Sequence, residues 1–149
     1  MDEETLAKLS RFFTEVGIIN QLASALVEKH LPGRMSSTQF GLLGHLARRP
    51  AGETPLQLAN AFQVPKTTMT HMLAVLEDHK LIEIGPNPED ARSKIVRATE
   101  AGAHFLTTKT ADLAGELAPI IAAIGPDTLT DPLPNLEKIR EALDAQRDT

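Results

Sequence analysis

The chain has 149 residues, 42% of them hydrophobic, so it can bury one core but is too short for two large independent domains. It contains no cysteine, which excludes disulfides, thiol nucleophiles and cysteine-based zinc sites. The net charge of −5 counts against a nucleic-acid partner because phosphates attract Lys and Arg, although the excess acid is concentrated in the last third.

The first residues, MDEETLAKLS, are acidic and amphipathic, unlike the basic start and apolar stretch of a signal peptide. No apolar run reaches the length that spans a membrane. We therefore expect a cytoplasmic protein with no membrane partner.

Over residues 3–29, apolar side chains recur at three- and four-residue steps, which predicts one long helix. Pro32 and Gly33 follow, and these residues stop a helix and reverse the chain. A helix this apolar at a chain end is expected to pack on another chain or on the other terminus.

Two short helices are expected next. Ser36 and Gln39 have the spacing of a capping box, in which two side chains satisfy the free amides of a helix's first turn. Thr54 and Gln57 repeat that spacing, with Pro55 at the first helical position. The second of these helices should run over residues 55–62.

The helix that begins at Lys66 is strongly amphipathic. Its inward stripe follows the i, i+3, i+4, i+7 pattern and consists of Met69, Met72, Leu73 and Leu76. Its outward face is short, hydrogen-bonding and nearly uncharged, and consists of Lys66, Thr67, Thr70, His71 and Ala74. Such a face suits contact with base edges in a major groove, although a merely solvated surface is the plainer interpretation.

Residues 81–84 and 93–98 are β-rich and flank a tip of turn-forming residues at 86–90, which predicts a hairpin. Thr99 should cap a helix over residues 100–124, with Pro119 kinking it or starting a new segment. Residues 127–134 are expected to form a loop, and Asn135 to cap a last helix. The fold expected is mainly α with a small β-hairpin wing.

The order of elements, and above all the stretch from Pro55 to Gly102, resembles the MarR family of winged-helix transcriptional regulators. The most specific pieces are NPEDAR at residues 87–92, with its Asp-x-Arg, and ATEAG at residues 98–102. The resemblance covers nearly the whole chain. It implies a single MarR-type domain over residues 1–149, with a winged helix-turn-helix at 36–99 flanked by dimerisation helices at 1–33 and 100–149.

The resemblance also implies a homodimer on double-stranded DNA, acting as a repressor of a palindromic operator and released by a small aromatic or phenolic effector. The residues expected to contact DNA are Thr54, Gln57, Lys66, Thr67, Thr70, His71, Asn87, Asp90, Arg92 and Lys94. Asp90 would orient Arg92 for the minor groove, or pair with it merely to shape the turn. Phe12, Phe13 and Met35 are candidates for the effector site, with core packing as the alternative.

Some positions depart from the family pattern. Gln63 stands where Gly is common in the helix-turn-helix connection, and Pro65 where a Ser cap is frequent. Ile84, Gly85 and Ala91 stand where the start and tip of the wing often carry arginine. The alternative function is therefore a winged-helix ligand- or protein-binding module that has lost specific DNA binding.

No enzyme is expected, because there is no nucleophile elbow and no Gly-rich phosphate loop. No cofactor is expected either. The five histidines, at 30, 45, 71, 79 and 104, are scattered rather than spaced as metal ligands.

Overall fold

The structure is a computed structural model that describes residues 1–147, so the last two residues of the expected 100–149 segment lie outside it. The chain divides into two compact units, Met1–Leu113 and Ala114–Thr149. Within the described part, no helix has both the length and the apolarity needed to cross a membrane.

The first unit begins with the long helix predicted from the apolar spacing, α1 (Glu3–Glu28). The Asp2 carboxylate caps it by accepting a 2.7 Å hydrogen bond from the Thr5 amide. The hydrogen bonds that Thr5 donates, from the backbone first, hold the pKa of Asp2 below its ordinary value. Not one residue of α1 is buried, although the helix carries many large apolar side chains.

Both predicted capping boxes are confirmed. At α2 (Ser37–Ala47), the Gln39 amide donates to the Ser36 hydroxyl and the Ser36 amide to the Gln39 side chain. At α3 (Pro55–Ala61), Thr54 and Gln57 exchange the same pair of bonds, at 2.8 and 3.2 Å. These local bonds fix where each helix starts, because they satisfy amides that have no partner inside the helix.

Helices α3 and α4 (Lys66–Asp78) end in the same way. Gln63 and Lys80 follow their helices with φ of 55° and 60°, in the left-handed region that glycine adopts most easily. The amides of the next residues, Val64 and Leu81, reach back to carbonyls in the last helical turn. This is the Schellman geometry, in which the left-handed position favours glycine.

The wing is an antiparallel hairpin of β1 (Ile82–Asn87) and β2 (Asp90–Ala98), with Ile82 opposite Ala98 and an irregularity after Pro86. The predicted hairpin is confirmed, but its strands extend further into the tip than the turn-forming residues indicated. A third element joins its edge, because Glu53 pairs with Val96 through both backbone hydrogen bonds, of 3.1 and 2.9 Å.

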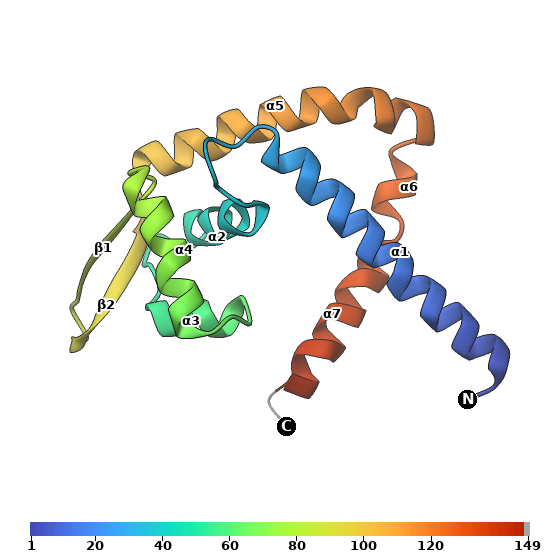
Figure 1. Ribbon diagram of the computed structural model, residues 1–149, viewed down its shortest axis with the longest axis horizontal. Coiled ribbons are helices and arrows are strands. Elements are labelled where there is room, and N and C mark those ends of the chain that lie inside the picture. The colour runs from blue at the N-terminus through green and yellow to red at the C-terminus, as the bar shows by residue number, and fades with distance from the viewer. Residues whose placement is uncertain (148–149) are drawn as a thin grey trace. The chain divides into compact units, whose positions relative to one another are not determined.

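The hydrophobic core of this unit lies between α2, α3, α4 and the hairpin, which pack around one another in Figure 1. The inward stripe predicted for α4 is buried in it. The fully buried side chains share the centre: Leu42, Leu43, Leu46, Leu58, Met69, Leu76 and Val96. We call α2, α3, α4 and the hairpin the winged head.

Helix α5 (Glu100–Ile124) starts in the first unit and is capped as predicted, since the Thr99 hydroxyl accepts from the Gly102 amide at 3.0 Å. The same hydroxyl donates to the Lys80 carbonyl at 2.8 Å and so ties α5 to the end of α4. Gly102 permits this approach, because a Cβ there would lie 2.1 Å from the Leu81 carbonyl oxygen. The helix continues through Pro119 without a break.

The second unit contains the end of α5, a short helix α6 (Asp127–Thr130) and α7 (Leu133–Arg147). The expected loop over residues 127–134 is therefore wrong, as is the expected start at Asn135. Proline suits the first turn of a helix, where its missing amide would have no partner, and the Pro132 carbonyl accepts the amide of Leu136 at 3.0 Å.

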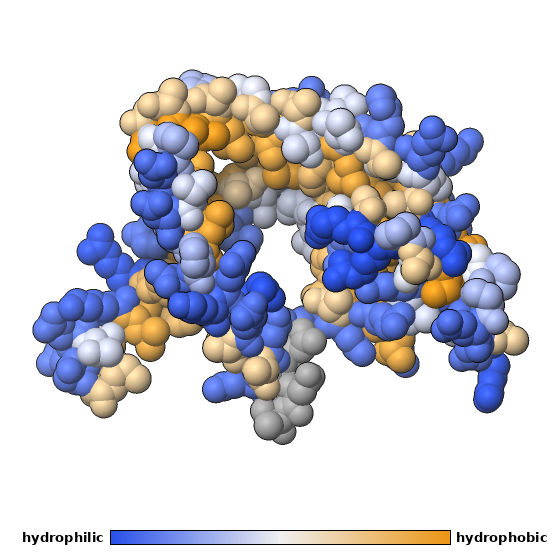
Figure 2. All heavy atoms as spheres, turned by 180° about the vertical axis from the view of Figure 1, so that it is seen from behind, coloured by the Kyte–Doolittle hydropathy of each residue, from blue (hydrophilic) through white to orange (hydrophobic). Residues whose placement is uncertain are grey.

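Large apolar side chains remain exposed on the flanking helices. On α1 they are Leu6, Leu9, Phe13, Val16, Ile18, Ile19 and Leu22. In the second unit they are Ile120, Ile124, Leu129, Leu133, Leu136 and Leu143. Figure 2 shows such apolar surface along α5, the helix that crosses the top of the view.

Candidate nucleic-acid interface

Helix α4 presents the polar face that the sequence predicts. Lys66, Thr67, Thr70 and His71 are all exposed on the side opposite the buried stripe. The Thr70 hydroxyl donates to the Lys66 carbonyl at 2.9 Å, so it meets a base only as an acceptor or through its methyl group. This face therefore carries donors, acceptors and a methyl group, the three features that a base edge in the major groove recognises.

The α3 side chains expected to touch phosphates are already engaged locally. Thr54 Oγ1 and Gln57 Oε1 accept the capping-box bonds, which leaves the Thr54 O–H and the Gln57 NH₂ as donors. Donors are what a phosphate needs. The local bonds hold both side chains in fixed positions without using the groups that would contact DNA.

The tip of the wing is shaped by side-chain bonds. The Asn87 amide donates to Ser93 Oγ at 2.8 Å and accepts from the Glu89 backbone amide at 3.0 Å. Asp90 Oδ1 accepts from the Arg92 backbone amide at 2.9 Å. Asn87 and Asp90 therefore build the turn, a role that Asx side chains commonly play.

This corrects the expected pairing of Asp90 with Arg92. The carboxylate holds the backbone amide of Arg92, and no ion pair of its guanidinium occurs among residues 1–147. The carboxylate favours the backbone because that amide lies within the same tight turn. Asp90 thus places the arginine but does not fix its rotamer.

Four cations of the winged head lack an ion pair within the described part of the chain: Lys66, Arg92, Lys94 and Arg97. Arg92 and Lys94 line a shallow hollow of about 280 Å³ on the hairpin. Ile84, Gly85 and Ala91, the three departures from the family pattern, line the same hollow. The wing therefore keeps two cations at a place where the pattern suggests more.

A second cleft, of about 380 Å³, lies between the start of α3 and the wing. It brings together three residues expected to contact DNA, Thr54, Gln57 and Asn87. It also contains Glu89 and Arg97, which are not among the residues expected to contact DNA. The alternation along β2 puts Arg97 on one face with Ile95, but no local pattern shows that the loop before α3 covers that face.

The loop that forms one wall of this cleft is held by a cluster around Glu53. Glu53 Oε2 lies 2.6 Å from His45 Nε2, and Oε1 lies 3.1 Å from Arg49 Nε. Arg49 also donates to His45 Nδ1 at 3.2 Å, and because a guanidinium only donates, Nε2 of the neutral ring carries the hydrogen that Glu53 accepts. The His45 ring also packs edge-on against Phe62.

The candidate effector residues do not gather at one place. Phe12 and Phe13 form an edge-to-face pair on α1, with ring centroids 5.4 Å apart, and Phe13 is exposed. Met35 is 3% exposed and lies in the core of the winged head. Met35 thus has the core-packing role that was the alternative to an effector site.

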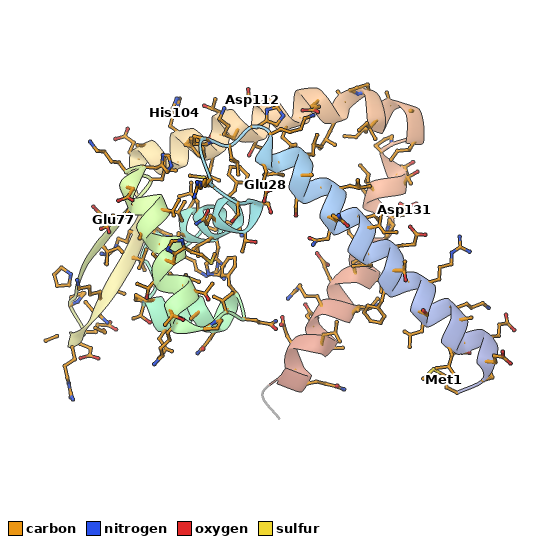
Figure 3. All side chains as sticks on the ribbon, viewed as in Figure 1. Met1, Glu28, Glu77, His104, Asp112 and Asp131 are labelled. Atoms are coloured by element: carbon orange, nitrogen blue, oxygen red, sulfur yellow. The ribbon has the colours of Figure 1, made fainter. Side chains whose placement is uncertain are left out.

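The histidines are spread over the fold, and His104 points away from its helix into the surroundings in Figure 3. Among residues 1–147, no three His, Cys, Asp or Glu side chains lie close enough to hold a metal ion.

A helix-turn-helix with an exposed second helix, followed by a paired hairpin, defines the winged-helix class. Wild-type MarR from E. coli in its apo form is similar at 28% identity and a TM-score of 0.68, with 83% of this chain and 94% of that chain covered. A mutant MarR from E. coli complexed with operator DNA is similar at 27% identity and a TM-score of 0.63, with 91% of this chain and 99% of that chain covered.

A MarR family transcription regulator of known structure is similar at 25% identity, with a TM-score of 0.74 over 98% of this chain and 97% of that one. A sequence model described as the MarR family matches residues 35–93. No curated protein matches the sequence significantly. Residues 35–93 thus match the MarR family, and the chain as a whole has the winged-helix fold of the MarR structures.

Proposed function

We propose that this protein is a homodimeric, sequence-specific DNA-binding repressor of a palindromic operator. The observation that carries the proposal is the exposed, hydrogen-bonding face of α4 beside the unpaired cations of the wing. The likeness to a MarR complexed with operator DNA supports it. The function also implies that the protein acts in the cytoplasm, where its DNA is, and that it is not an enzyme.

The dimer is supported by the flanking helices. Helix α1 has 26 residues and none is buried, although Leu6, Phe13 and Ile19 are large and apolar. Monomeric proteins seldom leave contiguous apolar patches of more than a few hundred Å² in water. A second copy of the chain would cover α1 and the apolar side of the second unit, and it would supply the second winged head.

Two heads would read two half-sites in successive major grooves, about 34 Å apart. A ligand that binds a dimer with a different head spacing more tightly would release the operator, because the two binding free energies are coupled. We propose a small aromatic or phenolic effector, with Phe12 and Phe13 as the residues placed to meet it.

One observation favours a second candidate, a winged-helix module without specific DNA binding. Much of the wing hollow carries apolar side chains or none, because Ile84, Gly85 and Ala91 line it. The chain as a whole is also acidic. Fewer cations mean fewer phosphate contacts and a weaker electrostatic contribution to binding.

The test is fluorescence anisotropy of the protein with the intergenic DNA upstream of its own coding sequence, against a scrambled duplex, at low and physiological salt. Preferential binding that saturates at one dimer per site supports the repressor. Equal binding to both duplexes, or none at low salt, favours the second candidate, and light scattering that finds a stable monomer contradicts the dimer.

A further inference from the structure

The cleft between the start of α3 and the wing has the features of an anion site that neither the fold nor the comparisons assign. Its walls come from elements far apart in the sequence: the loop before α3 and the two strands of the wing. Its volume of about 380 Å³ is large enough to admit a phosphate group. Arg97 lines it, and the described residues offer that guanidinium no ion pair.

Arg97 is placed there by close packing. A Cβ built on Gly52 would lie 2.8 Å from Arg97 Cγ and 2.6 Å from the Val96 carbonyl oxygen, so the arginine stem lies directly on the loop backbone. Gly52 also has a φ of 80°, which favours glycine for a second reason. In the hairpin register Arg97 stands opposite Glu83, yet the two side chains form no ion pair in the described structure.

The loop wall is rigid for a separate reason. Glu53 is joined to Val96 by two backbone hydrogen bonds, and its carboxylate is held by His45 on α2 and by Arg49 just after that helix. The cleft is therefore formed by fixed groups on both sides before any ligand arrives. Fixed groups lose less conformational entropy on binding than mobile ones.

The chemistry of the lining favours an oxyanion. A half-buried guanidinium presents a fork of N–H donors that matches phosphate geometry, and Thr54 and Gln57 each keep a free donor in the same cleft. Glu89 lines the cleft as well, and its carboxylate repels anions. The site therefore favours a singly charged anion that binds on the Arg97 side, away from Glu89.

We propose that Arg97, together with Thr54 and Gln57, binds a phosphodiester of the DNA backbone in this cleft. The inference rests on the proposed DNA-binding function and adds a residue to it. Arg97 then supplies part of the charge that Ile84 and Ala91 do not bring to the wing. A phosphate contact positions the protein on the duplex without reading sequence.

The test measures affinity for operator and scrambled DNA over a series of salt concentrations. R97Q should lower affinity about tenfold on both duplexes, and it should flatten the slope of log K against log salt by about 0.9 per lost contact, or about 1.8 per dimer. R97K should keep most of the slope. E89Q should change the affinity in the opposite direction and bind both duplexes more tightly, because it removes a negative charge from the cleft.

R140Q is the control, because it changes the net charge equally at an exposed arginine of α7 that already contacts Glu141 and Asp144. It should leave the salt slope unchanged. If the natural protein prefers its operator but R97Q keeps the full slope, the phosphate site is wrong and the repressor function stands. A lower affinity of E89Q also overturns the site, and this exposed residue can be changed without disturbing the core.

Inorganic phosphate distinguishes DNA from a free anion as the occupant. Thermal unfolding in phosphate and in chloride of equal ionic strength should give the same midpoint, because a single phosphate ion lacks the rest of the duplex contacts. Suppose instead that phosphate raises the midpoint, that R97Q abolishes this rise, and that R97Q leaves DNA binding unchanged. The cleft then binds a free oxyanion, and the proposal is overturned. If the natural protein binds neither duplex, the proposed function and the phosphodiester inference both fail.

Discussion

The cluster of Glu53, His45 and Arg49 should contribute measurably to stability, although all three side chains are charged or polar. Glu53 and His45 are 21% and 15% exposed, and their contact is short at 2.6 Å. A hydrogen bond to a charged group in such a place contributes about 1.5–3 kcal/mol. The bond to Arg49, which is 45% exposed, adds at most about 0.5 kcal/mol because water screens it.

We therefore expect Glu53→Ala to lower the free energy of unfolding by about 2–3 kcal/mol. At roughly 2–4 °C per kcal/mol for a chain of this size, the melting temperature falls by about 4–12 °C. Circular dichroism during urea and thermal unfolding measures both quantities. Glu83→Ala is the matched control, since Glu83 is an exposed carboxylate of the hairpin that Glu53 joins, and it should change stability by less than about 0.5 kcal/mol.

A double-mutant cycle identifies the origin of the effect. His45→Ala and Glu53→Ala should be non-additive by about 1 kcal/mol or more, because each removes the partner of the other. Additive effects within about 0.3 kcal/mol would refute the reasoning. Such a result would assign the loss to the packing of Glu53 rather than to its bond with the histidine.

Three further predictions concern the backbone and one terminus. Gln63→Gly and Lys80→Gly should each raise the free energy of unfolding by about 1 kcal/mol, because both positions have a left-handed backbone that glycine adopts more easily. Urea unfolding measures this change, and a loss of stability in both variants would contradict it. Gly102→Ala should cost about 2–3 kcal/mol because its Cβ would collide with a carbonyl oxygen, whereas Gly115→Ala in the same helix meets nothing within 4 Å and should stabilise slightly. NMR titration should find the pKa of Asp2 below 3.8, because the first-turn amide of Thr5 donates a hydrogen bond to the charged carboxylate. The contribution of this carboxylate to helix stability is complete above its ordinary pKa and is lost as the pH falls through its lowered pKa. An unshifted titration midpoint would contradict the cap.

Short-range patterns predicted most of the winged head. The capping boxes at Ser36 and Thr54 were readable because both partners lie three residues apart. The buried stripe and polar face of α4 followed from helical periodicity alone. In each case the signal and the structure it determines lie within one or two turns of a helix.

Interactions between distant segments were not readable. The pairing of Glu53 with Val96 involves one residue of a loop, so it leaves no alternating pattern. Arg97 could not be selected for the same reason, since its position in a cleft depends on that loop. Asp90 showed a different ambiguity, because a carboxylate two residues before an arginine can bond either the guanidinium or the backbone amide.

The C-terminal helices show how one residue type supports two interpretations. Pro126, Pro132 and Pro134 indicated a loop, because proline ends a helix. Proline equally suits the start of one. Here Pro126 precedes α6, Pro132 precedes α7, and Pro134 lies in the first turn of α7. A sequence with several prolines in a row of polar residues does not by itself distinguish these cases.

The most direct test of the account is whether the outward face of α4 reads bases. Thr70 and Thr107 both donate a hydroxyl hydrogen bond to the carbonyl four residues earlier, on exposed helix faces, so their alanine variants are matched in local structure. The quantity to measure is the ratio of affinities for operator and scrambled DNA. Thr70→Ala should lower this ratio by about 5- to 150-fold, through loss of about 1–3 kcal/mol of discrimination, and Thr107→Ala should leave it unchanged. An unchanged ratio in Thr70→Ala, equal to that of Thr107→Ala, would contradict the claim that α4 is the recognition helix.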